Sequence, residues 1–275
     1  MAEEHPYRPP AWRTLRADRV IYEDDAVLAL DKPVGISVMG ERHGDDLVSL
    51  AQAEGERLFP AHRIDKVTSG AVLLTKSVEV HAGLTRQFHA RSVDRAYFVL
   101  TRTTGLPTHG TIDLPLSVGR KSRVRVAAPR AGITADEAGG AWTVSPDDVF
   151  AGVRSYPSVT MFARVWADAA CSVLVVRAVT GRRHQIRVHL AWIGHPIDGD
   201  PLFQAAAPDG RTGLHSWRIA FDAAWQDGAR LQVHAAPGPD FWAPVLPRLP
   251  GGEPTAVLEA ADRAAEVLFA SPGPT

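Results

Sequence analysis

Short runs of apolar, β-branched residues recur along the chain with the spacing of strands. The run 71–75 (AVLLT) is apolar at nearly every position, as in a strand buried on both faces, and 94–101 alternates in character. Asp24-Asp25 separates two such runs, which predicts a hairpin, and the runs at 158–166 and 171–179 predict another. We expect strands over 19–23, 26–31, 71–75, 94–101, 158–166, 171–179, 214–221 and 230–234.

Four segments instead carry apolar residues with the spacing of a helix. Val80, Leu84 and Phe88 recur at every fourth position, which predicts a helix over 78–91, and Ser77 is a suitable N-cap. The segment 182–193 ends before Gly194 and Pro196, which are common stop signals for helices. The other two predicted helices span 45–56 and 253–269.

In two regions the apolar residues show neither the spacing of a helix nor that of a strand. Residues 1–19 are polar and proline-rich, and we expect an irregular arm. Residues 130–157 are rich in Gly, Pro and Asp, and we expect an insertion or ordered loop there. The pattern therefore predicts one domain over 20–250, followed by a C-terminal helix and tail over 251–275.

The composition indicates a globular protein from a reducing compartment. Cys171 is the single cysteine and lies in an apolar run, so we expect a small core residue in a cytoplasmic protein. No run approaches about 18 consecutive apolar residues, and the N-terminus has no signal-peptide pattern, so we expect no membrane partner. The formal net charge of −1 argues against a broad nucleic-acid-binding coat but permits a local basic groove.

The segment 62–70, HRIDKVTSG, places one carboxylate among cations. Asp65 is flanked by His62, Arg63 and Lys66, and a small polar turn follows it. Nearby cations favour the ionised carboxylate, which can act as a nucleophile or a general base. On these residues alone, a surface Asp paired with Arg63 or Lys66 is the alternative.

This segment resembles the HRLD-x-x-TSG signature of the RluA-type pseudouridine synthases. Residues 22–38 (YEDDAVLALDKPVGISV) resemble the opening motif of that family, which contains DKP-x-G. Residues 180–202 (TGRRHQIRVHLAWIGHPIDGDPL) resemble its TGR-x-HQIR-x-H and GHP-x-x-GD motifs. The resemblance covers about 20 to about 221. It implies an α+β catalytic domain with the pseudouridine synthase fold, whose central sheet is mixed and mostly antiparallel.

The resemblance implies an RNA pseudouridine synthase that acts on rRNA or tRNA, without a metal, an organic cofactor or an obligatory protein partner. Asp65 would initiate cleavage of the N1–C1′ bond, either by attacking C1′ or by removing the 2′ proton. Tyr97 would stack on the base or transfer a proton, and a core tyrosine is the alternative. Arg187 would form an ion pair with Asp65, and a solvated basic helix face is the alternative.

A second set of residues is expected to bind RNA. Arg63 would fill the place of the nucleotide released from the RNA. The basic residues after Gly181 would lie at a helix start, where free N–H groups favour phosphate. The basic run at 119–126 would extend this track, or form a solvated edge strand that limits aggregation. The expected RNA-binding residues are His62, Arg63, Arg182, Arg183, His184, Arg120, Lys121 and Arg123, with Arg125 beside them.

Other functions fit parts of the sequence. A metal hydrolase is suggested by His184, His189, His195, Asp198 and Asp200. However, His184 and His189 would be turned about 140° around a helix, whereas shared zinc ligation uses a spacing of four residues. A nucleoside hydrolase would need a second carboxylate or a metal near Asp65. A catalytically silent RNA-binding relative of the same fold is the main alternative.

Overall fold

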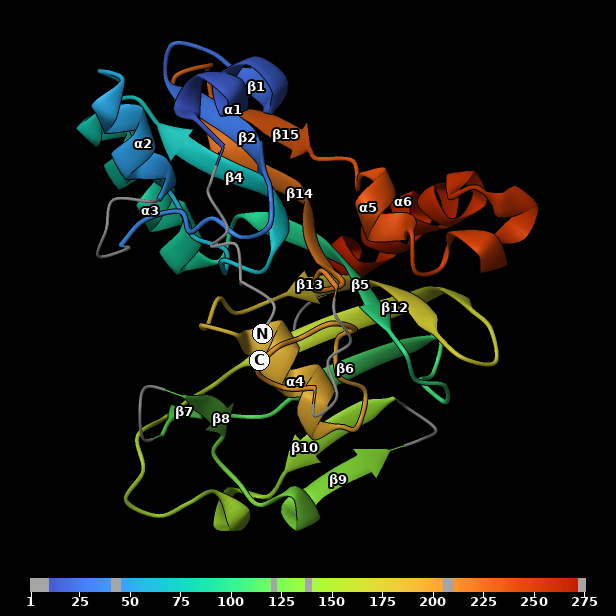
Figure 1. Cartoon of the computed structure of the whole chain (residues 1–275). Coiled ribbons are helices and arrows are strands. Elements are labelled where there is room, and N and C mark those ends of the chain that lie inside the picture. Colours follow the sequence, from blue (N-terminus) through green and yellow to red (C-terminus); the bar gives the residue numbers. More distant parts are fainter. Residues whose placement is uncertain (1–9, 41–45, 120–122, 137–139, 205–209, 272–275) are drawn as a thin grey trace, which may run out of the picture. The chain divides into compact units, whose positions relative to one another are not determined.

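The computed structural model describes residues 10–40, 46–119, 123–136, 140–204 and 210–271 (Figure 1). The chain forms two compact units. Unit 1 comprises Met1–Val93 and Ser216–Ala236, and unit 2 comprises Asp94–His215 and Pro237–Thr275. This division cuts through the segment 20–250, for which the sequence predicts one domain. Within the described residues, no helix is both long and apolar enough to cross a lipid bilayer.

Unit 1 contains strands in the order β1-β2-β4-β14-β15, of which β1·β2, β2·β4 and β14·β15 pair antiparallel. The strand β4 is buried at all seven of its positions, which confirms the buried strand predicted from the apolar run. The predicted hairpin around Asp24 is also confirmed, because β1 pairs antiparallel with β2. The short strand β3 pairs antiparallel with β4. The strands are β1 (Val20–Glu23), β2 (Val27–Lys32), β3 (Phe59–Pro60), β4 (Ser69–Thr75), β14 (Leu214–Ala223) and β15 (Ala229–His234).

Helix α3 (Val78–Ala90) confirms the predicted helix and its cap. The Ser77 side chain accepts a hydrogen bond from the Val80 N–H at 3.3 Å, which satisfies one of the free donors of the first turn. Leu84 is fully buried, and Val80 and Phe88 pack beside it against the unit 1 core. Helix α2 (Leu47–Ala53) begins after Asp46, whose side chain caps the Ser49 N–H.

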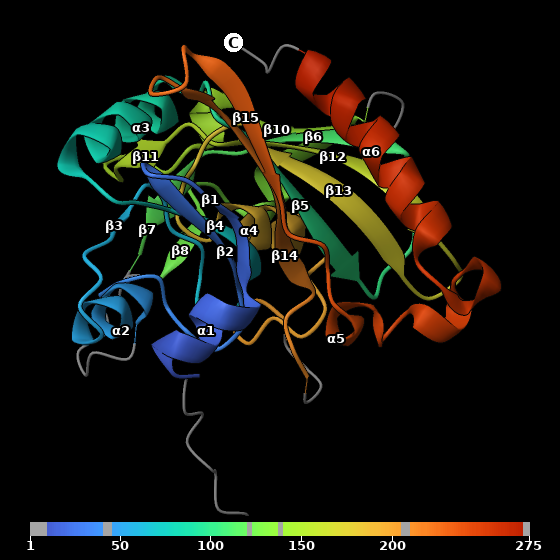
Figure 2. The same ribbon diagram turned by 90° about the horizontal axis from the view of Figure 1, so that it is seen from above.

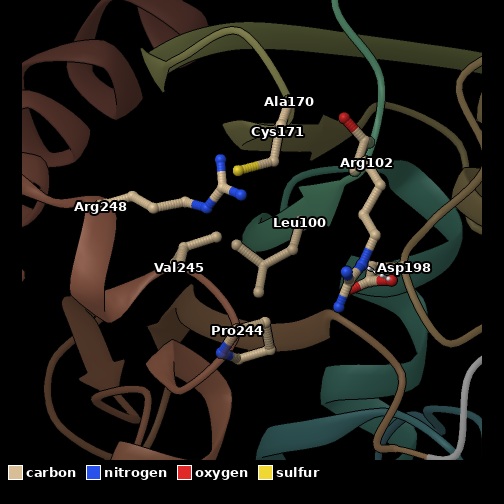
Figure 3. A pocket seen from close by; sticks show the side chains of 9 residues that line it. Leu100, Arg102, Ala170, Cys171, Asp198, Pro244, Val245 and Arg248 are labelled. Carbon is tan, nitrogen blue, oxygen red and sulfur yellow. Dashed lines mark hydrogen bonds and ion pairs between the residues drawn. The ribbon is translucent and has the colours of Figure 1, made fainter.

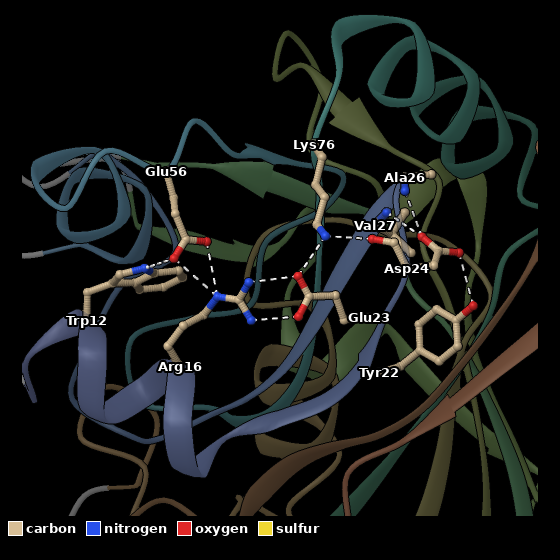
Figure 4. A network of polar contacts seen from close by, with 9 residues as sticks. All are labelled: Trp12, Arg16, Tyr22, Glu23, Asp24, Ala26, Val27, Glu56 and Lys76. Atoms are coloured by element: carbon tan, nitrogen blue, oxygen red, sulfur yellow. Dashed lines mark hydrogen bonds and ion pairs between the residues drawn. The ribbon is translucent and has the colours of Figure 1, made fainter.

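The irregular arm predicted for residues 1–19 is wrong for its second half, because helix α1 (Trp12–Asp18) lies there, whereas residues 1–9 lie outside the described residues. Such a short helix is unstable by itself, and tertiary contacts stabilise this one. Trp12 is buried and donates to Glu56 at 2.8 Å, and Arg16 forms two hydrogen bonds with Glu23 at 2.7 Å (Figure 4). The hydrogen bonds from Arg16 lower the pKa of Glu23 to about 2.

Unit 2 contains a sheet with the order β5-β13-β12-β6-β10-β9. Strand β10 pairs parallel with β6, whereas β5·β13, β13·β12, β12·β6 and β10·β9 are antiparallel. A mixed, mostly antiparallel sheet is therefore confirmed. The strands are β5 (Asp94–Thr101), β6 (His109–Asp113), β9 (Ile133–Asp136), β10 (Ala141–Val144), β12 (Val159–Ala167) and β13 (Ser172–Ala178).

A smaller sheet in unit 2 has the order β11-β7-β8. Helix α4 packs against β8, and helix α6 lies along β12 and β13 (Figure 2). Arg177 of β13 donates to the carbonyls of Leu268 and Ser271 at the end of α6. The elements are β7 (Leu116–Val118), β8 (Val124–Val126), β11 (Ser155–Tyr156), α4 (Gln185–Trp192), α5 (Pro239–Trp242), α6 (Thr255–Ala270), and the short 3₁₀ turns η2 (Arg130–Gly132), η3 (Pro146–Asp148), η4 (Leu246–Arg248) and η5 (Pro250–Gly252).

The segment 130–157, predicted to be an insertion or ordered loop, is more regular than expected. This segment contains β9, β10 and β11, and β10 joins the main sheet of unit 2 beside β6. The register aligns Trp142 with Ile112, a residue distant in sequence. Strand pairing of this kind depends on a partner edge that local sequence patterns do not reveal.

Candidate active site

Asp65 lies in unit 1, in the turn that leads into β4. Its neighbour Ile64 is buried and anchors the segment, while Asp65 is half-buried. The backbone carbonyl of Asp65 accepts a hydrogen bond from the Thr68 N–H at 3.0 Å, which closes the turn. The carboxylate is therefore carried by an ordered turn attached to a fully buried strand.

The DKP-x-G loop after β2 supports this turn through the backbone of Lys66. The Lys66 carbonyl accepts from the Gly35 N–H at 2.8 Å and from the Lys32 ammonium at 3.5 Å. The same ammonium donates to the carbonyls of Pro33 and Ile36, both at 2.8 Å, and Lys32 is only 1% exposed. Lys32 had no role assigned from the sequence, although the DKP-x-G motif was recognisable there.

The backbone conformation and close packing at Gly70 explain why the TSG motif ends in glycine. Its φ is +103°, and a Cβ atom at this position would lie 2.1 Å from the Ser216 carbonyl oxygen. Both the left-handed backbone and the close approach of β14 require glycine. The start of β4, and with it the turn that carries Asp65, is fixed by this contact.

His62 and Arg63 have different surroundings. The His62 ring accepts a hydrogen bond from the Leu73 N–H at 3.1 Å and stacks on Phe88 with ring centroids 5.1 Å apart. These contacts attach the segment to β4 and α3. Arg63 is exposed. RNA binding by either residue stays a prediction.

Tyr97 lies in unit 2, on β5, where it is 7% exposed and lies opposite Val176 of β13. Arg95, two positions earlier, donates to the Ala178 carbonyl at 3.3 Å. Tyr97 and Asp65 belong to different units, each described by itself, so a shared role in catalysis stays a prediction.

Arg187 lies on α4 and is almost fully buried. Its guanidinium binds Asp200 through two hydrogen bonds of 2.7 and 2.9 Å. Asp200 is also buried and accepts from the Leu202 N–H at 2.9 Å. The sequence-based interpretation missed Asp200 as a partner of this arginine, and its pairing with Asp65 in the other unit stays a prediction. The solvated helix face considered for Arg187 is wrong, because the side chain is buried.

The predicted helix at 182–193 begins later than expected, at Gln185. The Gln185 side chain accepts from the Arg182 N–H at 3.0 Å and from the Thr180 hydroxyl at 2.6 Å, and it donates to the Val159 carbonyl at 2.8 Å. His184 precedes the helix with φ +55°. Arg183 is therefore outside the helix and does not share a helix face with Arg187, as the sequence had suggested.

The side chains that suggested a metal site have other partners. His189 is buried between the Thr160 hydroxyl at 2.9 Å and the Leu114 carbonyl at 3.0 Å, and burial lowers its pKa to about 4. Asp198 binds Arg102 at 2.7 Å. Within the described ranges, no three His, Cys, Asp or Glu side chains are grouped so that they could hold a metal ion.

The basic run at 119–126 is partly described. Arg120 and Lys121 lie outside the described residues. Arg123 and Arg125 are exposed, and Arg125 alternates with the buried Val124 and Val126 on β8. The edge-strand alternative and the RNA-binding alternative both fit this arrangement.

A small pocket of about 100 Å³ lies elsewhere in unit 2 (Figure 3). Cys171 lines it and is buried, as predicted. Burial raises the pKa of its thiol to about 11, so the thiol is protonated at neutral pH and is a poor nucleophile. The two arginines in the lining, Arg102 and Arg248, have Asp198 and Asp168 as ion-pair partners.

Comparison with known proteins gives a consistent result. Residues 26–192 match the family model described as RNA pseudouridylate synthase, a range that includes Asp65, Tyr97 and Arg187. The chain is 28% identical over 246 residues to ribosomal large subunit pseudouridine synthase D of Nitrosomonas europaea, covering 83% of this chain and 64% of that protein. It is 30% identical to the mitochondrial tRNA pseudouridine(32) synthase of Saccharomyces cerevisiae, covering 72% of this chain and 39% of the yeast protein.

The chain thus spans between about one third and two thirds of the length of several curated relatives. A solved structure, human RNA Pseudouridylate Synthase Domain Containing 4, aligns with a TM-score of 0.66 at 19% identity. It covers 91% of this chain and 95% of the human one. At this identity the likeness establishes the fold, which is the one that the sequence motifs predicted.

Proposed function

The chain belongs to the RNA pseudouridylate synthase family, and from that premise we propose that it isomerises uridine to pseudouridine in RNA. The N1–C1′ bond of the nucleotide breaks, the uracil turns over, and C5 bonds to C1′. The C5 proton is released and N1 takes up a proton, so the base gains and loses no atoms. The departing uracil anion is delocalised, so this bond can break without the second carboxylate that most glycosidases use.

Asp65 is the group that initiates the reaction, by attack on C1′ or by removal of the 2′ proton. The observation that carries this assignment is the way the Asp65 turn is held. Gly35 and Lys32 bind the carbonyl of Lys66, and Gly70 fixes the start of β4. A carboxylate on an ordered turn is positioned for one task at low entropic cost. Tyr97 and Arg187 are assigned to base stacking and to orientation of Asp65, respectively.

The relatives named above act on ribosomal RNA and on tRNA, so both kinds of RNA are candidate substrates. We propose a cytoplasmic location, because a single cysteine suits a reducing compartment. We propose no cofactor, no membrane partner and no obligatory protein partner.

The test is carbodiimide-adduct primer extension on total rRNA and tRNA incubated with wild-type protein or with Asp65→Asn. We expect a new stop with the wild-type protein and none with Asp65→Asn, because the amide can neither attack C1′ nor remove the proton. Asp25→Asn is the matched control, since Asp25 is an exposed aspartate in the β1–β2 turn of the same unit. It should give the wild-type stop.

Thermal unfolding and RNA binding of Asp65→Asn are measured in parallel. Residual product from a correctly folded Asp65→Asn protein would remove Asp65 from the chemistry. A wild-type protein that binds RNA but gives no stop on either RNA pool would instead support the catalytically silent alternative.

A further inference from the structure

Ten arginines of unit 2 fall into two groups. One group has carboxylate partners, namely Arg102 with Asp198, Arg187 with Asp200, Arg211 with Asp240 and Arg248 with Asp168. A second group is exposed, has no ion pair within the described part of the chain, and lies on or beside the β11-β7-β8 sheet. Its members are Arg123, Arg125, Arg130, Arg154, Arg182 and Arg183. Six arginines on or beside this sheet therefore lack a carboxylate partner within the described ranges.

Two arginines of the second group share one aromatic ring. The guanidinium carbon of Arg154 lies 5.1 Å from the centroid of the Tyr156 ring, and that of Arg182 lies 5.2 Å from the same centroid. Tyr156 is half-buried on the edge strand β11, while both arginines are exposed. The face of an aromatic ring attracts cations, so Tyr156 holds two guanidinium groups in a defined place although they repel each other.

Strand register separates this cluster from the arginines of β8. Tyr156 lies opposite Leu116, and Leu116 lies opposite the buried Val126, so these three side chains share one face of the small sheet. Arg125 is in the alternate position, opposite Ser117, and its guanidinium lies over Phe150. The Arg154–Tyr156–Arg182 cluster is therefore a separate surface, next to the residues that precede α4.

Two fixed, exposed guanidinium groups without a carboxylate partner suit an anion with several phosphate groups. Guanidinium binds phosphate oxygens bidentately, and an aromatic platform reduces the entropy that the arginine loses on binding. A phosphodiester backbone supplies successive phosphates at a spacing that neighbouring arginines can match, and such contacts position a nucleic acid without reading its sequence.

We propose that Arg154, Tyr156 and Arg182, with Arg183 beside them, form a contact surface for the phosphodiester backbone of RNA. The proposal rests on the proposed function for the identity of the polyanion. Arg154 and Tyr156 lie outside the sequence motifs that suggested the activity, so this surface adds a docking region to the candidate active site. It contributes affinity and orientation rather than chemistry.

The test measures the affinity of the full chain for labelled bulk tRNA and for labelled rRNA fragments by filter binding, at several salt concentrations between about 50 and 200 mM. Arg154→Gln should weaken binding roughly fivefold and should lower the slope of log K against log salt by about 0.7–0.9, the change expected for one lost phosphate contact. Arg248→Gln removes the same charge from an exposed arginine with a carboxylate partner, and it should leave both quantities nearly unchanged.

The contribution of the Tyr156 ring is tested with separate variants. Tyr156→Phe keeps the aromatic face and should bind RNA like the wild type, whereas Tyr156→Leu loses the platform for both arginines and should weaken binding at least as much as Arg154→Gln. Thermal unfolding of each variant shows whether the fold is intact. Because the arginine variant alters only an exposed side chain, it keeps the test decisive if Tyr156→Leu unfolds.

Unchanged affinity and salt slope in Arg154→Gln would overturn the proposal. An equal loss in Arg248→Gln would overturn it as well, because net charge rather than this surface would then determine binding. Primer extension with the wild-type chain is scored independently. If the chain forms pseudouridine but Arg154→Gln binds RNA like the wild type, only the proposed contact surface is refuted. If binding depends on Arg154 but no pseudouridine forms, only the proposed function is refuted.

Discussion

The two motif segments of the chain are held in different ways. Around Asp65, the contacts run mainly through the backbone: Lys32 and Gly35 bind a carbonyl, and Gly70 allows β14 to approach. The segment 180–202 is instead held by buried polar side chains, above all Arg187 with Asp200, and Gln185 with Thr180 and Val159.

The two segments therefore meet different structural requirements. A turn that is held through its backbone keeps its shape when one of its side chains is replaced, so the fold should tolerate substitution of Asp65. A buried network of charged and polar side chains contributes to folding only while it is complete, because each unsatisfied member costs free energy. Substitutions in the second segment should therefore lower stability most, and substitutions around Asp65 should lower activity more than stability.

The largest effect on stability is expected from Asp200→Ala. It removes the carboxylate that binds the buried Arg187, and loss of one partner of a buried ion pair costs roughly 3–5 kcal/mol. Arg230→Gln, which breaks the ion pair between the exposed side chains of Arg230 and Asp222, should cost about 1 kcal/mol or less. Urea unfolding of both variants measures the difference. Similar costs for the two would contradict the distinction between a buried network and a surface pair.

A pH effect of intermediate size is expected from His189 in the same segment. Burial lowers its pKa from 6.5 to about 4, so below pH 6.5 the unfolded chain takes up a proton that the folded chain does not. The free energy of unfolding should therefore fall as the pH drops from about 6.5 to about 4, by roughly 3 kcal/mol in total.

The measurement is the free energy of unfolding in urea at intervals across that pH range. His189→Gln should be less stable than the wild type at neutral pH, but its stability should depend less on pH within this window. If both proteins show the same slope, His189 does not set the pH dependence.

A smaller effect on stability than that of Asp200→Ala, but a clear effect on activity, is expected from Lys32→Met. Methionine fills a similar volume, while the hydrogen bonds to the carbonyls of Pro33, Ile36 and Lys66 are lost at a cost of about 1–3 kcal/mol. Because the Asp65 turn loses a support, kcat should fall about tenfold or more with little change in KM. A loss of stability without a change in kcat would show that Lys32 supports the fold and not the turn.

The sequence by itself determined the elements whose stability is local or whose pattern is continuous. The apolar run of β4, the strand β5 and the β12–β13 hairpin were predictable because buried strands are rich in apolar and β-branched residues. Ser77 and its helix were predictable because a cap and an apolar face both lie within a few residues of one another. The motif order was sufficient to identify the family.

Only the tertiary structure decided the features that depend on distant partners. Helix α1 forms because Trp12 and Arg16 bind Glu56 and Glu23, and β10 forms beside β6. Helix α4 begins at Gln185 because that side chain bonds to the residues before it and to β12. In the same way, Asp200 became the partner of Arg187, and Tyr156 brought Arg154 and Arg182 together. Local patterns record burial and turns, but they do not record which distant side chain completes a hydrogen bond or neutralises a charge.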